Sequence, residues 1–492
     1  MLRNRLFLIL GWSNYGYKDT LNELADLNKD LYDLLNLFHN LKSISDSATA
    51  YLTTMAIRIF YMHKLLKDTG SFYLHCDPTM SHYLKLVCDM IFREKNFRNE
   101  IIWQRTTTHN DSKQGAKHFG RVSDSILFYS KNDKKQMFKT IYREYSKEYM
   151  LSSYNKIDEN GKRFKASDLS AAKGGGDTGY EWKGNFPPAG RFWSYSKENM
   201  MQFEKEGRLY YSNTGKPYLK HYLDDMPGNS IDNIWADIGL AEKAERLGYP
   251  TQKPEALLDR IINASSNEGD IVADFFCGCG TTIAVAQKLN RQWIGADISH
   301  LAVRLIKKRL VETYGKGIEH NLKLHGMPKD VASARELAQN VEGGRIGFQD
   351  WAIEVMLNGI VNEKKVADGG FDGYITFQSQ IGKQFALIET KSGKLTVKNM
   401  REFFQVIDFQ KAAAGIFVCF KENVTSEMVK AAKDAGQIKI DTVSYNIDKI
   451  QIITVEDLFE GRQPQLPNAA ENQTFKKAKR NDDKAVSHGL FD

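Results

Sequence analysis

A short turn rich in glycine and cysteine carries the first candidate chemistry. Residues 274–282 read DFFCGCGTT and follow the apolar run Ile271–Ala273. A zinc site needs three or four converging ligands, and Cys277 and Cys279 have no nearby histidine or second cysteine pair to complete such a set. Glycines instead let the backbone approach a ligand closely, and a helix starting near Thr281 would direct its positive end toward it. The turn therefore favours a cradle for a nucleotide-like cofactor over a metal or redox site.

Two acidic residues flank this turn. Asp274 ends the strand before it, where a carboxylate would repel a dinucleotide pyrophosphate and attract the cationic amino group of S-adenosylmethionine. Asp297 follows the next strand, about twenty residues further on, where a carboxylate can accept hydrogen bonds from ribose hydroxyls. A tight strand-to-helix connection with no ligand is the alternative for a turn of this kind.

Regular patterns predict the elements that position the turn. After Pro254, one helical face collects Leu257, Leu258, Ile261, Ile262 and Ala264. A strand over 271–274, a helix over 281–289, a strand over 292–297 and a helix through 301–310 then follow. This βαβα order predicts a parallel sheet covered by helices. Further upstream, an apolar stripe over 52–66 predicts a helix, 71–75 a buried strand and 83–87 a second helix.

The stretch Gly248–Ser299 resembles motifs X, I and II of the β-class amino-methylating DNA methyltransferases, which include the adenine-specific modification subunits of type III restriction systems. Gly70–Phe92 resembles the family segment ahead of the recognition insert, so the likeness covers most of residues 17–315. It implies S-adenosylmethionine as cofactor and double-stranded DNA as substrate, with methylation of adenine N6 expected and cytosine N4 left open. Carried over position by position, the cofactor contacts are Asp274, Phe276, Gly278 and Gly280 at the methionine part, Asp297 at the ribose, and Thr251 and Lys253 across the pocket.

The resemblance breaks at the catalytic element. In this family the target base is flipped out of the duplex, and Asp/Asn-Pro-Pro followed by an aromatic residue holds it. Asp77–Met80 is half a match, Phe186–Pro188 lacks the acid, and Gly11–Tyr15 stands about where the loop belongs but lacks the prolines. We therefore assign no catalytic residue for methyl transfer. Either the start misses upstream coding sequence or shifts frame, or this copy is degenerate and binds without turnover.

Residues 100–245 show weaker periodicity and read as an insert. Tyr180–Phe186, Arg191–Trp193 and Lys216–Lys220 interleave aromatic and basic residues. Cations can hold phosphates while rings stack on an extruded base, so the insert is predicted to recognise the DNA target. A small aromatic core with a solvated lysine face is the alternative.

A second constellation lies further along the chain. In the sequence DGGFDGYITF…FALIETKSGK, Asp372 is expected at the start of a strand. Glu389 and Lys391 are expected at alternate positions of the next strand, so that both side chains lie on one face of it. Two carboxylates and an ammonium can bind Mg²⁺ and orient water for phosphodiester cleavage, whereas the alternative is an exposed salt bridge. Asp368–Lys394 resembles the PD-(D/E)xK restriction-endonuclease-like fold. The resemblance implies a nuclease with Asp372, Glu389 and Lys391 as catalytic residues and Asp372 and Glu389 as Mg²⁺ ligands.

The sequence as a whole predicts an α/β protein with a Rossmann-like S-adenosylmethionine-dependent methyltransferase sheet, a target-recognition insert and a smaller α/β restriction-endonuclease-like domain. A length of 492 residues suggests about three structural units. The predicted boundaries are 1–99 and 246–325 for the methyltransferase domain, 100–245 for the insert, 326–345 for a linker, 346–460 for the endonuclease-like domain and 461–492 for a disordered tail.

The amino-acid composition indicates the cellular compartment and the type of partner to expect. Five cysteines give no disulfide framework, which fits a reduced cytoplasm. The apolar run Leu6–Leu10 is too short for an export signal or a membrane span, so we expect no membrane contact. A net charge of +7 is compatible with a polyanionic partner. A separate restriction subunit and a homodimer both stay open.

Overall fold

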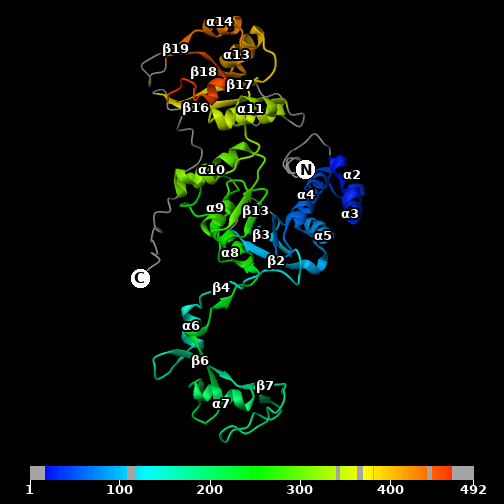
Figure 1. The fold of residues 1–492 in the computed structure, drawn as a ribbon, viewed down its shortest axis with the longest axis vertical. Coiled ribbons are helices and arrows are strands. Elements are labelled where there is room, and N and C mark those ends of the chain that lie inside the picture. Colours follow the sequence, from blue (N-terminus) through cyan, green and yellow to red (C-terminus); the bar gives the residue numbers. More distant parts are fainter. Residues whose placement is uncertain are drawn as a thin grey trace. The chain divides into compact units, whose positions relative to one another are not determined.

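The computed structural model describes residues 17–107, 115, 117–249, 251–339, 344–362, 370–379, 382–439 and 446–467. The chain divides into two compact units, of which the first comprises Met1–Phe138 and Ile234–Asp492 and the second Lys139–Asn233 (Figure 1). The second unit is narrower than the predicted insert over 100–245. The reason is that the strand over 123–130 pairs with the strand that starts at Ser71, and the strand over 97–104 pairs in turn with the strand over 123–130, so both belong to the first unit.

The N-terminal part of the first unit is a helical layer beside a sheet. Its elements are α2 (Tyr17–Leu27), α3 (Lys29–Asn40), α4 (Asp46–Leu65), β1 (Ser71–Cys76), α5 (Ser81–Phe92), β2 (Phe97–Gln104), β3 (Ser123–Ser130) and β12 (Ile234–Trp235). The predicted apolar stripe is α4, which buries Leu52, Met55 and Ile59. The sheet order is β1-β3-β2-β12, with β3 antiparallel to both neighbours and β12 parallel to β2.

The predicted βαβα unit is confirmed. Its elements are α8 (Glu255–Ser265), β13 (Ile271–Asp274), α9 (Thr281–Lys288), β14 (Gln292–Gly295) and α10 (His300–Tyr314), and Figure 1 shows them in green. Strands β13 and β14 pair in parallel. One face of this pair is covered by helices, because Val272 and Trp293 pack against Ile262 of α8 and Val285 of α9.

The second unit contains short strands and two helices around a small aromatic core. Its elements are β4 (Tyr142–Arg143), α6 (Lys147–Ser153), β5 (Lys156–Ile157), β6 (Arg163–Asp168), β7 (Ser170–Ala171), β8 (Phe192–Trp193), α7 (Lys197–Lys205), β9 (Leu209–Tyr211), β10 (Pro217–Tyr222) and β11 (Asn229–Ser230). Trp182 and Trp193 are buried there with Met200. Phe186 is 64% exposed, so only some of the interleaved aromatics are available to a ligand.

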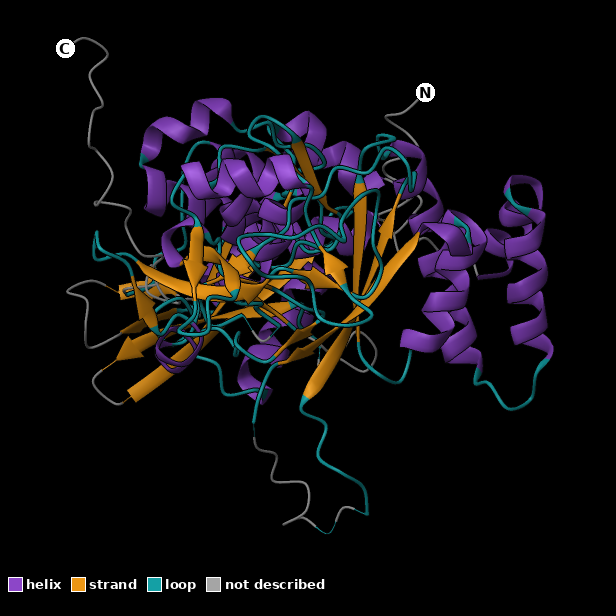
Figure 2. Cartoon of the chain, turned by 90° about the horizontal axis from the view of Figure 1, so that it is seen from below, coloured by secondary structure: helices purple, strands orange, loops and turns teal. Residues whose placement is uncertain are grey.

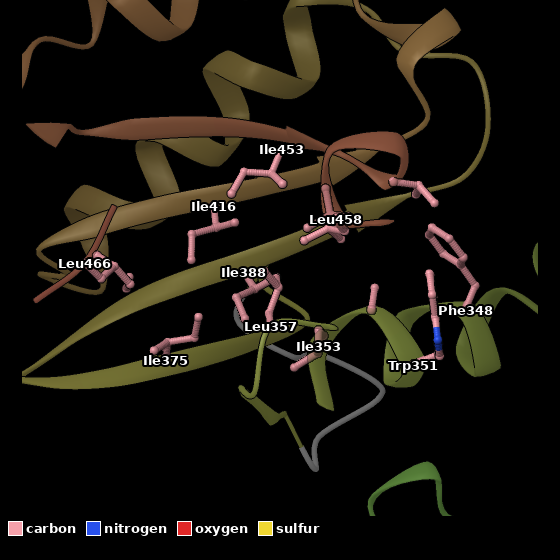
Figure 3. Close-up of a cluster of buried hydrophobic side chains, with 14 of the residues drawn as sticks. Phe348, Trp351, Ile353, Leu357, Ile375, Ile388, Ile416, Ile453, Leu458 and Leu466 are labelled. Carbon is pink, nitrogen blue, oxygen red and sulfur yellow. The ribbon is translucent and has the colours of Figure 1, made fainter. Parts of the chain in front are cut away.

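The C-terminal part of the first unit is built on a five-stranded sheet of order β15-β16-β17-β18-β21. Its elements are α11 (Val331–Gln339), α12 (Gly344–Asp350), a π-helical turn (Trp351–Met356), β15 (Ile360–Val361), β16 (Gly373–Ser379), β17 (Gly382–Lys391), α13 (Val397–Phe409), β18 (Ala414–Cys419), α14 (Ser426–Asp434), β19 (Gln437–Lys439), β20 (Asn446–Asp448), β21 (Ile450–Thr454) and α15 (Val455–Phe459). Every residue of β18 is buried. Figure 3 shows the apolar cluster, which includes Ile416 and Trp351, on one face of this sheet.

Two predicted boundaries need correction or restriction here. The linker over 326–345 is wrong, because α11 occupies Val331–Gln339 and its Ala334 packs into the core beside Phe348. Of the predicted disordered tail, residues 461–467 are described and Leu466 packs into the same core, while 468–492 lie outside the described residues. Among the helices of the described part (Figure 2), none combines the length and the apolar character needed to cross a bilayer.

Candidate functional site

A cavity of about 840 Å³ lies in the first unit against the glycine turn. It is lined by α4, β1, α8 and β13, together with the turn itself. Of the seven predicted cofactor residues, five line it: Thr251, Lys253, Asp274, Phe276 and Gly278. Gly280 and Asp297 do not line it, and their contacts instead hold the turn in shape.

The two glycines of the turn are required by its backbone and packing. Gly278 and Gly280 have φ of +48° and +73°, a left-handed conformation that costs a residue with a Cβ atom free energy. A Cβ atom on Gly280 would lie 2.5 Å from Cγ1 of Ile306 in α10. At Gly278 it would lie 3.1 Å from Cε1 of Tyr249. The glycines therefore let the turn sit directly against α10 and beside the cavity.

Asp274 is a half-buried carboxylate with two local donors. Its Oδ1 accepts a hydrogen bond from the Phe276 amide at 3.0 Å, and its Oδ2 accepts one from Oγ1 of Thr282 at 2.6 Å. Burial, with a smaller contribution from the charge of Asp297, raises the pKa of Asp274. A cation in the cavity would offset that cost, since an opposite charge favours the ionised form.

Asp297, which follows β14, is hydrogen-bonded to the turn. Its Oδ2 accepts a hydrogen bond from the Gly278 amide at 2.8 Å, and its Oδ1 accepts one from the Ser299 amide at 3.0 Å. A carboxylate has about four lone-pair positions, so these two bonds leave capacity for a hydroxyl donor. The predicted ribose contact at Asp297 stays a prediction.

Two further lining residues, His75 and Asp124, belong to a charged cluster that the sequence did not predict. Nε2 of His75 lies 2.9 Å from Oδ2 of Asp124, and Nε of Arg105 lies 3.2 Å from Oδ1 of the same carboxylate. Although burial opposes it, the bond to His75 and the charges of Arg105 and Lys253 lower the pKa of Asp124. Burial lowers the pKa of Lys253. The Asp274 carboxylate and the partly buried Lys253 ammonium thus line the same cavity.

The cysteines of the turn are packing residues. Both thiols are buried, and Sγ of Cys277 donates to the carbonyl of Ala296 at 3.1 Å. Burial raises the pKa of Cys277 and of Cys279, which keeps both as thiols at neutral pH. Within the described ranges, no three His, Cys, Asp or Glu side chains converge as a metal site would require.

The three fragments considered for the catalytic element are not brought together. Asp77 lines the cavity, but its Oδ1 accepts a hydrogen bond from the Thr79 amide at 2.7 Å in a turn ahead of α5. Phe186–Pro188 lies in the second unit. Gly11–Tyr15 lies outside the described residues.

The predicted acidic site of the C-terminal part is assembled on two neighbouring strands. Asp372 immediately precedes β16, and its Oδ2 accepts hydrogen bonds from the amide and Oγ1 of Thr390 at 2.7 and 2.8 Å. Lys391 pairs with Glu389 on β17, as expected for alternate positions of one strand. Although burial lowers it, the bond to Glu389 and the charge of Asp372 raise the pKa of Lys391. The three side chains therefore share one electrostatic environment.

Comparison with known proteins assigns the larger part of the chain to a family. Residues 32–308 match the family model described as DNA methylase. The chain belongs to this DNA methylase family. It is 36% identical over 263 residues to the type II methyltransferase M.EcaI of Enterobacter cloacae, covering 53% of this chain and 57% of that protein. It is 30% identical over 270 residues to the Mod subunit of the type III restriction-modification enzyme StyLTI of Salmonella typhimurium, covering 51% and 40%.

A third relative, the DNA adenine methyltransferase YhdJ of Escherichia coli, is 29% identical over 248 residues, covering 50% of this chain and 63% of that protein. The chain thus spans about half the length of the curated relatives that it matches. Residues 349–460 match a separate family described as NACHT-associated inactive restriction endonuclease. The C-terminal part is therefore similar to restriction endonucleases, and the matching description specifies an inactive form.

Proposed function

We propose that this DNA methylase transfers a methyl group from S-adenosylmethionine to the exocyclic amino group of a base in double-stranded DNA, with adenine N6 as the first target to test. The observation that carries the proposal is the half-buried Asp274 carboxylate beside the glycine turn, in the cavity that Lys253 also lines. The family membership and the adenine-specific name of one relative support it.

The residues of the cavity fit the proposed cofactor by charge. The methionine end of S-adenosylmethionine carries an ammonium and a carboxylate, and Asp274 and Lys253 offer the opposite charge for each. Asp297 accepts a hydrogen bond from the Gly278 amide and has further lone pairs that can accept one from a ribose hydroxyl. When bound, the cofactor supplies the methyl group. Thr251, Phe276 and Gly278 supply further wall around it.

The second unit is proposed to hold the DNA target. Its exposed Phe186 and the half-exposed Lys156 of β5 and Lys220 of β10 leave a ring and two cations at the surface, although two of its tryptophans are core residues. A restriction subunit is the proposed protein partner, since one relative is a Mod subunit of a restriction-modification enzyme. Homodimerisation is a further proposal, and the proposed setting is the cytoplasm.

The test uses unmethylated double-stranded DNA and S-adenosylmethionine labelled in its methyl group. We expect label in the DNA, found as N6-methyladenine after digestion, and loss of label with Asp274→Ala. The matched control is Glu268→Ala, which removes an exposed acid six residues earlier in the loop. Absence of DNA label from the wild-type chain would refute the proposal.

A separate binding measurement distinguishes an enzyme from a remnant without turnover, the alternative raised by the unassigned catalytic element. Isothermal titration with S-adenosylmethionine reports the cavity whether or not transfer occurs. Binding that depends on Asp274 and Asp297, combined with no transfer, would establish the remnant. No binding at all would remove the proposed cofactor from the cavity.

A second function, Mg²⁺-dependent DNA cleavage, is favoured by the convergence of Asp372, Glu389 and Lys391. Mg²⁺ is commonly held by one or two carboxylates with water completing its shell, so Asp372 and Glu389 would suffice as protein ligands. We expect nicking of supercoiled DNA that requires Mg²⁺ and disappears in Glu389→Ala. Glu402→Ala, which changes an exposed acid of α13, is the control. Nicking that survives in Glu389→Ala would exclude this site, and no nicking would agree with the matched description.

A further inference from the structure

The sheet of the second unit, in the order β5-β6-β10-β9, has two different faces. Leu209 of β9 and Leu219 of β10 pack into the aromatic core together with Trp193, so the face on which they lie is covered. Side chains alternate between the two faces of a sheet, which places Tyr210 and Lys220 on the opposite face. Both of these side chains are half-buried. The second face therefore carries partly accessible aromatic and charged side chains.

Strand register brings four aromatic rings together on this second face. Residues directly opposite each other on antiparallel strands point to the same face, and Phe164 of β6 lies opposite Tyr222 of β10. In the same way, Tyr218 of β10 lies opposite Tyr210 of β9. The ring centroids are 6.0 Å apart for Phe164 and Tyr222, 5.7 Å for Phe164 and Tyr210, and 6.2 Å for Tyr210 and Tyr218. The four rings form one continuous group, which we call the aromatic row.

One lysine lies over each ring of the aromatic row. Nζ of Lys156 donates a hydrogen bond to Oη of Tyr210 at 3.2 Å, in addition to lying over its ring. A free lysine side chain loses rotamer entropy when a ligand fixes its ammonium group, and a lysine already held on a ring loses less. All four ammonium groups lie within the range of about 6 Å in which a ring attracts a cation. The distances from Nζ to the ring centroid are 4.6 Å for Lys156 and Tyr210, 5.5 Å for Lys220 and Phe164, 5.1 Å for Lys216 and Tyr218, and 6.0 Å for Lys162 and Tyr222.

The two central lysines keep their charge available to a ligand. At one end of the row, Nζ of Lys216 lies 3.1 Å from Oδ1 of Asp168. At the other end, Asp158 accepts a hydrogen bond from the tyrosine hydroxyl of the row at 3.0 Å. None of the ion pairs among the described residues of the second unit includes Lys156 or Lys220. Four lysines against two aspartates leave this face positively charged.

We propose that this face binds backbone phosphates of double-stranded DNA, with Lys156 and Lys220 as its principal phosphate contacts. The inference rests on the proposed function, which makes double-stranded DNA the substrate, and it assigns to the second unit a contact that does not depend on base sequence. An ammonium group is a compact charge with three donors, of which Lys156 uses one on Tyr210 and keeps two for a phosphate. Phosphate contacts of this kind position a protein on the duplex without reading its bases.

The proposed surface differs from the one that residue composition alone indicated. Of the three aromatic and basic stretches predicted to recognise DNA, Lys216–Lys220 includes part of β10 and so lies on this sheet. Tyr180–Phe186 and Arg191–Trp193 instead contribute Trp182 and Trp193 to the core that covers the other face. The rings of the second unit therefore divide into a buried set that stabilises the fold and a row that holds lysines in place.

The salt dependence of DNA binding tests the two phosphate contacts in the full-length chain. Fluorescence anisotropy measures the affinity for a labelled, unmethylated duplex without S-adenosylmethionine, at salt concentrations from about 50 to about 200 mM. Each phosphate contact contributes about 0.9 to the slope of log affinity against log salt. Lys156→Gln and Lys220→Gln should therefore each reduce the slope by about 0.9, and equally on two duplexes of unrelated sequence. Lys197→Gln, at an exposed residue of α7, whose Met200 packs in the core, is the control and should leave the slope unchanged.

Tyr210→Leu separates the charge of Lys156 from the ring that holds it. This variant keeps both lysines, so the slope should stay that of the wild type, while the affinity should fall about two- to fivefold because Lys156 is no longer held over a ring. A slope reduced as much by Tyr210→Leu as by Lys156→Gln would mean that both variants act through the fold of the sheet. That result would overturn the assignment of Lys156 as a phosphate contact.

Two further results would overturn the inference: a wild-type slope in both lysine variants, or no DNA binding by the wild-type chain. Isothermal titration of the variants with S-adenosylmethionine should match the wild type, because the cavity lined by Asp274 lies in the other unit. Failure of the proposed function gives a different result. DNA binding with a slope that depends on Lys156 and Lys220, combined with no methyl transfer, would refute the transfer and support the phosphate contacts.

Discussion

Replacing Gly280 by alanine measures the packing that holds the glycine turn against α10. Its φ of +73° costs an L-residue about 1–2 kcal/mol. The new Cβ would lie 2.5 Å from Cγ1 of Ile306, whose side chain is only 8% exposed and has little room to move. Overpacking of this kind costs about 1–3 kcal/mol. The sum is about 2–5 kcal/mol of local stability.

Gly269→Ala is the matched control, because Gly269 has a similar φ of +79° and its Cβ would meet nothing within 4 Å. The two variants should therefore differ by the overpacking alone, about 1–3 kcal/mol, or about 5- to 150-fold in an opening equilibrium. Hydrogen exchange over 271–295 measures that ratio, and exchange over 414–419 serves as the internal reference. Equal acceleration in both variants would show that the contact with Ile306 has no energetic cost, and the reasoning about this turn would be refuted.

Three further predictions concern charges and cores. The pKa of Asp274 is raised in the folded state, so its ionised carboxylate lowers the free energy of unfolding at neutral pH. Asp274→Asn should therefore raise the thermal midpoint at neutral pH, and this increase should become smaller as the pH falls. The pKa of Asp124 is shifted in the opposite direction. Because it is lowered in the folded state, the ionised carboxylate contributes stability that is present above about pH 4 and lost as the pH falls further. In urea titrations, Asp124→Asn should lower the free energy of unfolding by about 1–3 kcal/mol near neutral pH and change it little in acid. Trp193→Ala should destabilise the second unit by about 3–5 kcal/mol, whereas Phe186→Ala should change its thermal midpoint little and weaken DNA binding in a filter assay.

Local signals in the sequence predicted the elements around the cavity. The spacing of apolar residues over 52–66 and 254–264 predicted the helices α4 and α8. The strand-turn-helix pattern around residue 274 predicted β13 and α9. These features depend on residues close together in the chain, so periodicity and glycine content are sufficient to find them. The same holds for Glu389 and Lys391, which share a face because they are two residues apart on one strand.

Contacts set by strand register could not be predicted in this way. In the β1–β3 pairing His75 lies opposite Ile126, and Asp124 is two residues along the same face, which brings it to the imidazole. The order β1-β3-β2 differs from the order in the chain, so no local pattern indicates which residues will be opposite. Helix α11 was missed for a different reason: its short apolar side consists largely of alanines such as Ala334, which give a weak periodic signal.

The geometry of β13 and β14 explains why the Gly280 contact should matter locally. A two-stranded sheet is marginally stable by itself, and this pair is covered on one face by α8 and α9 while Ile271 on the other is 53% exposed. The contacts that hold the turn after β13 include the bond from the Gly278 amide to Asp297 and the close packing of Gly280 on α10. A perturbation at either point should loosen the cavity wall without reaching the five-stranded sheet, whose core is separate.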